Sequence, residues 1–75
     1  MANLPIVRPR EAVAALQRAG FVAHHQTGSH LVLKLEGAVT RRVTVPMHAR
    51  DLKKGTLRSI LREAGLSVDE FVALL

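Results

Sequence analysis

The stretch Thr27-Gly28-Ser29-His30-Leu31-Val32-Leu33-Lys34-Leu35 decides how the rest of this chain is interpreted. Its Gly-Ser pair is typical of a turn, and the six residues that follow alternate in the manner of a strand. Successive side chains of a strand point to opposite faces, so we expect the three leucines to face the core. The opposite, open face then carries His30, Val32 and Lys34.

Two further strands are expected beside this one. Residues 21–26 precede the Gly-Ser turn, and residues 40–46 follow a second turn at Glu36-Gly37-Ala38. In residues 40–46 two valines alternate with polar residues, so we expect the valines to point inward and Arg42 to point outward. Short connections between three successive strands favour an antiparallel meander.

Amphipathic helices are expected before and after the strands. Residues 9–19 and 54–64 carry apolar side chains at helical spacing, and each run precedes a glycine, which suits the left-handed residue at a helix end. Residues 68–75 form a short closing helix, because Ser67-Val68-Asp69-Glu70 has the capping-box pattern. The sequence therefore predicts an α+β fold, α-β-β-β-α(-α), with helices on one face of a three-stranded antiparallel sheet, as in a double-stranded RNA-binding domain (dsRBD).

Composition limits the class of protein. Seventy-five residues indicate a single domain, 1–75, and the lack of cysteine fits a cytoplasmic protein. We expect no membrane span and no secretory signal, because no apolar run is long enough and the N-terminus lacks the pattern. Eleven Lys and Arg against six Asp and Glu give a net charge of +5, which favours an anionic partner, nucleic acid first and an acidic protein second.

A row of cations is expected along the second main helix. Lys54, Arg58 and Arg62 recur at every fourth residue and so share one side of it. Such a row is usually a solvated helix face. Here Arg50 and Lys53 add positive charge near the start of the helix, where backbone N–H groups already favour phosphate. We therefore interpret the row as a phosphate-backbone site.

The four histidines do not predict a metal site. His24 and His25 are adjacent, so a regular strand points them to opposite faces, and no acidic residue stands at a ligand spacing from them. One of the two is expected at the core side, in a structural role. We expect no metal and no cofactor.

His30 is the candidate catalytic residue. Histidine can give and take protons near neutral pH, and RNA supplies its own nucleophile, the 2′-hydroxyl. A metal-free ribonuclease then needs a base, cations that stabilise the phosphorane, and a second acid. Lys34, which we expect beside His30 on the open face, and Arg42 on the adjoining strand fit the cations, with His48 as the candidate second acid or base. A single exposed histidine is more often inert, so binding without catalysis stays open on these grounds.

Three blocks of the sequence resemble the HicA (YcfA-like) mRNA interferase family. They are Gly28-Ser29-His30, Val43-Thr44-Val45-Pro46 with His48 two residues on, and the run from Leu52 to Gly65. The resemblance covers nearly the whole chain. It departs at Lys54, where the family often has proline, and at Leu31, where it often has histidine or an aromatic residue.

The resemblance implies a dsRBD-like fold and a toxin of a type II HicA–HicB toxin–antitoxin system. Such a toxin is a metal-independent endoribonuclease acting on mRNA, with His30 in the catalytic position. A HicB-type antitoxin would cover this histidine in a hetero-oligomer. The expected RNA-binding residues are Gly28, Ser29, Lys34, Arg42, Lys53, Lys54, Arg58 and Arg62.

Two other functions use the same basic surface. One is a non-catalytic double-stranded RNA-binding module, and the other is a cationic adaptor that binds only protein. RNA affinity that falls steeply with salt separates the first two functions from the adaptor. Cleavage separates the enzyme from the RNA-binding module.

Overall fold

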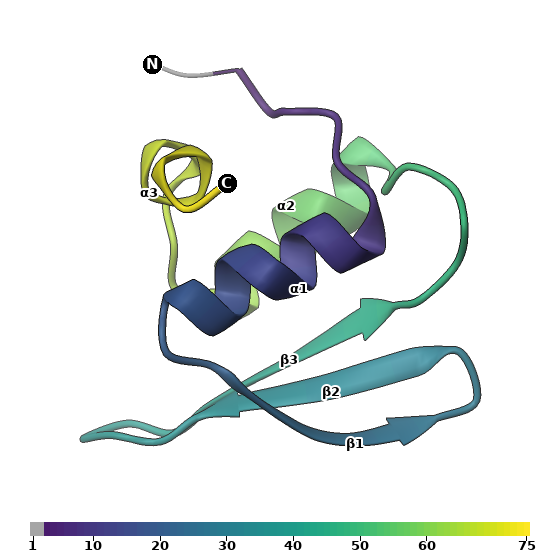
Figure 1. Ribbon diagram of the computed structural model, residues 1–75. Helices are drawn as coiled ribbons and strands as arrows, with labels where there is room; N and C mark the ends of the chain where they lie inside the picture. The colour runs from purple at the N-terminus through teal and green to yellow at the C-terminus, as the bar shows by residue number, and fades with distance from the viewer. Residues whose placement is uncertain (1–2) are drawn as a thin grey trace.

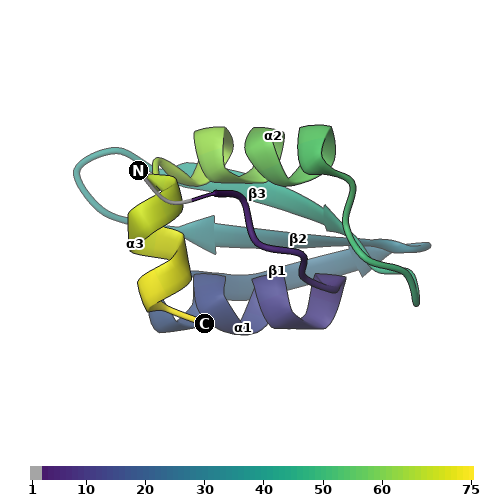
Figure 2. The same ribbon diagram turned by 90° about the horizontal axis from the view of Figure 1, so that it is seen from above.

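The computed structural model describes residues 3–75 and has the predicted order of helix, three strands, helix and short helix (Figure 1). The strands form one antiparallel sheet in the order β1-β2-β3, and two helices lie side by side on one of its faces (Figure 2). The predicted α+β class is therefore confirmed. The elements are α1 (Pro9–Arg18), β1 (Val22–Thr27), β2 (His30–Leu35), β3 (Arg41–Pro46), α2 (Lys54–Ala64) and α3 (Val68–Ala73).

The core lies between the sheet and the helices, as the leucine pattern predicts. Leu33, Val43 and Val45 are fully buried there, and Leu31 and Leu35 pack against the same core while remaining partly accessible. The apolar stripe of α2 covers them from above. Its buried side chains are Leu57, Ile60, Leu61 and Ala64.

Val32 departs from the expectation of an open, solvated face. It belongs to the side of β2 that points away from the helices, yet it is 5 % exposed. It is not part of the main core. Residues opposite one another in an antiparallel pair share a face, and Val32 is opposite His25 on β1 and Thr44 on β3. Val32 is therefore the buried centre of what we call the outer face of the sheet.

Both main helices end as the glycine pattern predicts. Gly20 and Gly65 have φ angles of 105° and 73°. The Phe21 N–H donates to the Leu16 carbonyl at 3.0 Å, the hydrogen bond of a Schellman ending. In α2 the Leu66 N–H makes the equivalent bond to the Leu61 carbonyl at 3.0 Å.

The segment before α1 is more than an extended lead-in. It runs between α1 and α2 (Figure 2), and its Val7 is buried. The Leu52 N–H donates to the Val7 carbonyl at 2.8 Å, and Leu52 is itself buried. This contact fixes the loop between β3 and α2 against the start of α1.

The capping box of α3 forms as predicted. The Glu70 N–H donates to Ser67 Oγ at 3.0 Å, and the Ser67 N–H donates to Glu70 Oε1 at 2.9 Å. The helix ends at Ala73, and Phe71 is its fully buried residue. Arg18 Nη1 donates to the Leu74 carbonyl at 2.6 Å and so joins the end of α3 to the end of α1.

Glu70 should give the stability of α3 a measurable pH dependence. Hydrogen bonds from the Ser67 N–H, and secondarily the Ser67 side chain, lower the pKa of Glu70 below its ordinary value of 4.5. A carboxylate with a lowered folded-state pKa contributes stability above the unfolded pKa, and this contribution is lost as pH falls through the folded pKa. We expect Glu70→Gln to lower the Tm near neutral pH and the difference from wild type to shrink in acid.

Thermal unfolding followed by circular dichroism between about pH 3 and 7 checks this expectation. Val72→Ala removes an exposed, uncharged side chain from the same helix and is the control. Its difference from wild type should not change with pH. A Glu70→Gln difference that stays constant down to the acid limit would contradict the role of the carboxylate.

Candidate functional site

His30 begins β2, directly after the two-residue turn of the β1–β2 hairpin. It stands opposite Thr27 on β1 and Pro46 on β3. Gly28 has a φ of 57° at the first turn position, as a type II′ hairpin turn requires. The next residue in β2 faces the core, so His30 points to the outer face, where it is exposed.

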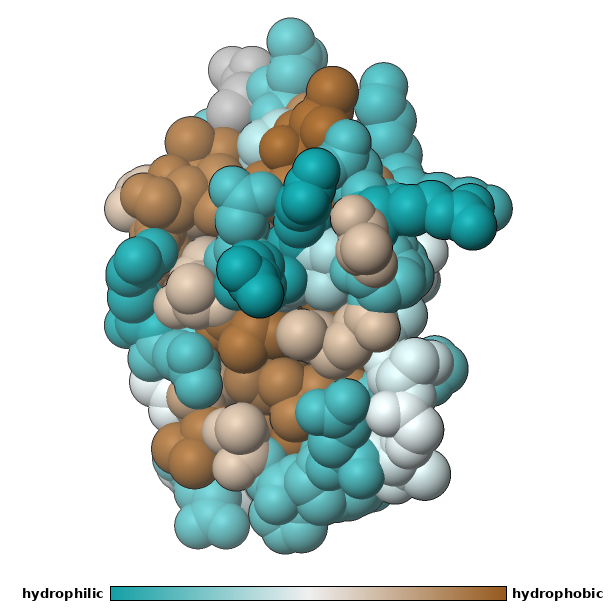
Figure 3. All heavy atoms as spheres, turned by 45° about the vertical axis from the view of Figure 1, so that its right-hand side comes forward, coloured by the Kyte–Doolittle hydropathy of each residue, from teal (hydrophilic) through white to brown (hydrophobic). Residues whose placement is uncertain are grey.

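The same end of the molecule holds the loop between β3 and α2. The Met47 N–H donates to the Ser29 carbonyl, which joins this loop to the hairpin turn. A hollow of about 390 Å³ between the loop and α2 brings the end of β3 together with the cationic start of the helix. Figure 3 brings this end forward, with hydrophilic side chains projecting around an apolar centre. The hollow is lined by Pro46, His48, Arg50, Asp51, Lys53 and Thr56.

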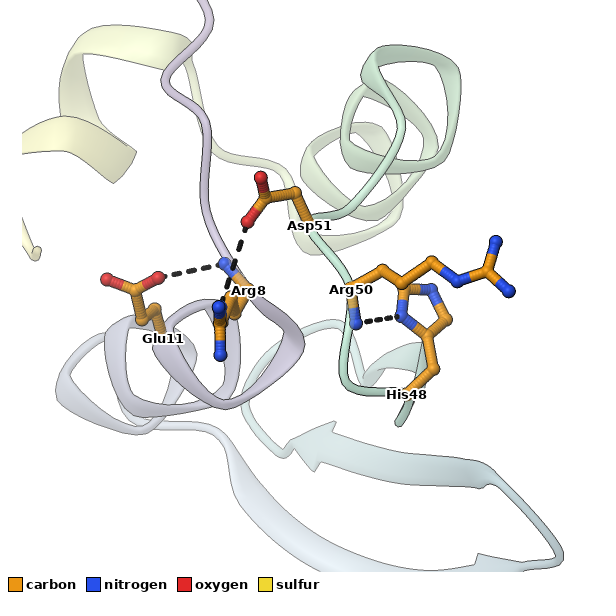
Figure 4. A network of polar contacts seen from close by, with 5 residues as sticks. All are labelled: Arg8, Glu11, His48, Arg50 and Asp51. Carbon is orange, nitrogen blue, oxygen red and sulfur yellow. Dashed lines mark hydrogen bonds and ion pairs between the residues drawn. The ribbon is translucent and has the colours of Figure 1, made fainter.

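His48 has a defined hydrogen-bonding state in this loop. Its Nδ1 accepts the backbone N–H of Arg50 at 3.2 Å (Figure 4). In a neutral imidazole with Nδ1 as the acceptor, Nε2 carries the proton. His48 is therefore set to donate an N–H from Nε2 to an anionic oxygen.

Arg8 and Arg10 are two further cations at this end of the molecule, and no sequence motif marked them as site residues. With Met47, His48 and Ala49 they line a second hollow of about 450 Å³ on the α1 side of the loop. Their only signal in the sequence was the general excess of positive charge.

An ion pair links the loop to Arg8, whose backbone N–H also caps α1. Arg8 Nε lies 3.9 Å from Asp51 Oδ1, and Glu11 Oε1 accepts the Arg8 N–H at 2.9 Å (Figure 4). Both partners of the ion pair are more than half exposed, so the pair adds at most a fraction of a kcal/mol to stability. The pair links the loop to the residue that precedes α1.

Lys34 lies on the outer face with His30, but not beside it. It stands opposite Arg42 on β3 and Val22 on β1, four residues along β2 from His30. That separation is roughly 13 Å of strand. Lys34 and Arg42 therefore form a cationic pair at the other half of the sheet, away from His30.

The cationic row of α2 also leads away from this end. Arg58 and Arg62 lie roughly 6 and 12 Å along the helix from Lys54. All three are exposed. Of the predicted residues, the structure thus gathers Gly28, Ser29, His30, His48, Lys53 and Lys54 at one end, and spreads Lys34, Arg42, Arg58 and Arg62 along the sheet and helix. This suits an extended anion better than a single phosphate.

The expectation that His24 and His25 point to opposite faces is wrong. A β-bulge shifts the register of β1 between Ala23 and His25, so that His24 has no residue opposite it on β2. The extra residue breaks the alternation on which the expectation rested. The two rings instead meet, with Nδ1 atoms 2.6 Å apart and ring planes at 75°. Both side chains are exposed, and neither belongs to the core.

The electrostatic surroundings of His24 favour its neutral form. The positive charge of Lys34 is the main cause that lowers the pKa of His24, followed by loss of hydration and by the charges of His25 and Arg42. Glu36 acts in the opposite direction. The lowered pKa favours the neutral form of the His24 ring where it contacts His25.

The described chain offers no metal centre and no membrane-spanning helix. Within residues 3–75, no three His, Asp or Glu side chains come together as metal ligands would. None of the helices in the same range combines the length and the apolar character needed to cross a bilayer.

Comparison with known proteins identifies a family relationship. A family model described as the HicA toxin of bacterial toxin–antitoxin systems matches residues 9–66. The match runs from the first residue of α1 through the sheet and α2 to the residue after Gly65. No curated protein matches the chain.

Proposed function

Because the chain belongs to the HicA toxin family of bacterial toxin–antitoxin systems, we propose that it is an endoribonuclease that cleaves mRNA without a metal ion. The observation that carries this proposal is the position of His30. An exposed imidazole stands on the outer face at the end of the molecule where the cationic loop and the start of α2 meet. This end therefore combines a proton acceptor with groups that attract phosphate.

The reaction needs only the RNA and the side chains. His30 removes the proton of a 2′-hydroxyl, and the 2′-oxygen attacks the adjacent phosphorus. The bond from phosphorus to the 5′-oxygen then breaks and a second acid gives that oxygen a proton, which leaves a 2′,3′-cyclic phosphate and a 5′-hydroxyl. The His48 Nε2–H and the Lys53 ammonium stabilise the charge of the phosphorane oxygens.

The remaining cations hold the phosphates on either side of the cleaved bond. Arg58 and Arg62 follow Lys54 along α2, while Lys34 and Arg42 lie along the sheet. Gly28 and Ser29 present a turn with little side chain, so the RNA backbone can approach His30 closely. The spread of these cations favours contact with several nucleotides.

The partner that neutralises this activity is a HicB-type antitoxin. We propose that it binds in a hetero-oligomer and covers His30 and the cationic end, in the cytoplasm where mRNA is found. The net charge of +5 favours an acidic surface on that partner.

Incubation of the purified protein with an mRNA transcript in excess EDTA tests the function. We expect cleavage products that end in 2′,3′-cyclic phosphate, and RNA affinity that falls steeply as salt rises. Intact RNA that is nevertheless bound would show a non-catalytic double-stranded RNA-binding module. Negligible RNA affinity even at low salt would show a protein-binding adaptor.

A further inference from the structure

The β-bulge of β1 places a second histidine on the face that carries His30. After the bulge, His25 stands opposite Val32, and Thr27 stands opposite His30. Opposite residues share a face, so His25 and Thr27 both belong to the outer face. His25 is then the diagonal neighbour of His30 across the two strands.

The distance between His25 and His30 allows their rings to act on two different oxygens of one phosphodiester. Diagonal neighbours in an antiparallel pair have Cα atoms roughly 7–8 Å apart, which long side chains can bridge through a group held between them. A phosphodiester between the two rings could meet one imidazole at its 2′-oxygen and the other at its 5′-oxygen. Among residues 3–75, His48 lies in the loop after β3 and His24 is the unpaired bulge residue, so His25 is the histidine placed diagonally to His30 by the strand register.

His24 orients the ring of His25. The Nδ1 atoms are 2.6 Å apart, so one must donate and the other must accept. An imidazolium carries N–H on both ring nitrogens, so a protonated His25 donates its Nδ1–H and the His24 Nδ1 accepts it. The charges of Lys34 and Arg42 favour the neutral His24 that this bond requires. This bond leaves the His25 Nε2 available for proton transfer, the arrangement of a catalytic group held by a third residue.

We propose that His25 is the general acid of the cleavage reaction and that His24 is its positioning residue, an inference that rests on the proposed ribonuclease function. As the P–O5′ bond breaks, the His25 Nε2–H passes its proton to the leaving 5′-oxygen. His30 has by then taken the 2′-hydroxyl proton, so the two rings exchange protonation states and the charges balance. No cofactor or oxidant takes part.

His48 fits this role less well. Its Nδ1 already accepts the Arg50 N–H, so the imidazolium form that a general acid needs would lose that hydrogen bond. The bond between His25 and His24 persists in both forms of His25, because the donor proton on Nδ1 stays in place. His48 therefore serves as a phosphate ligand.

A substrate whose leaving group needs no proton tests the assignment. An RNA oligonucleotide with a 5′-bridging phosphorothiolate at one linkage expels a thiolate, which is stable without an acid. We expect His25→Ala to cut ordinary RNA about 10²–10⁴-fold more slowly than wild type and to cut the phosphorothiolate at a similar rate. His30→Ala should lose both activities, because the 2′-hydroxyl still needs a base.

Val22→Ala is the matched control, since Val22 is an exposed residue of β1 on the same face, opposite Lys34. It should cut both substrates as wild type does. His24→Ala should resemble His25→Ala, and His24→Asn, whose amide oxygen can accept the same hydrogen bond, should recover part of the loss. All variants change exposed side chains, and the Tm of each confirms that it is folded.

The outcomes separate the two proposals. If wild type cuts RNA and His25→Ala cuts it equally well, or loses both substrates equally, the assignment of His25 is overturned and the ribonuclease function stands. If folded wild type cuts neither substrate, the ribonuclease function itself is overturned, and the role of His25 with it.

Discussion

Replacing His30 by alanine is expected to lower RNA cleavage by about 10²–10⁴-fold, the contribution of one acid–base group. His30 is exposed at the first position of β2, and no hydrogen bond from its ring holds the fold together among the described residues. The change should therefore leave the Tm close to that of wild type. RNA affinity should also be nearly unchanged, because the cations of the loop and α2 remain.

Three measurements check this expectation. They are the cleavage rate in EDTA, RNA affinity at several salt concentrations, and growth after induction in the absence of antitoxin. Wild type should arrest growth and His30→Ala should not. The control is Thr44→Ala, which removes another exposed side chain from the outer face. A His30→Ala protein that cuts at the wild-type rate would remove His30 from the mechanism.

Replacing Phe71 by alanine should have the largest effect on stability. Phe71 is fully buried in the core although it belongs to the shortest helix, α3. Removal of a buried phenylalanine ring typically costs about 3–5 kcal/mol. A chain of this size has a free energy of unfolding on the order of 4–11 kcal/mol, so the variant should lose a large part of its stability.

Urea denaturation of wild type and Phe71→Ala measures this cost directly. Val72→Ala, the next residue of the same helix, is the control, and it should change stability by about 0.5 kcal/mol or less. The comparison matters because the family match ends at residue 66, before α3 begins. A Phe71→Ala protein as stable as the control would show that α3 contributes little to the folded state.

The main elements of the fold could be predicted because their patterns were strong and local. Leu31, Leu33 and Leu35 alternate cleanly, so the faces of β2 followed from the sequence. The glycines after α1 and α2 marked both helix ends, since a left-handed residue is needed there. The capping-box pattern predicted the start of α3 in the same way. Each signal depends only on residues within one turn or strand.

The parts that escaped prediction depend on contacts between distant segments. The bulge of β1 arises where β1 pairs with β2. No pattern in residues 22–27 indicates the bulge. Val32 is buried by neighbours on the two other strands, so the alternation of side chains along β2 alone wrongly assigned it to an open, solvated face. Arg8 and Arg10 join the site only because the segment before α1 packs against the loop after β3. The separation of Lys34 from His30 follows from strand length.

The bulge also bears on how such a site can arise in evolution. Ala23 pairs with Leu33 and His25 with Val32, so the removal of His24 alone would leave every other pairing of the hairpin in place. One codon inserted into an edge strand is thus enough to give an existing histidine a hydrogen-bonding partner. The core need not repack, because β1 is exposed along its whole length. Edge strands can acquire or lose such partners at little risk to the rest of the fold.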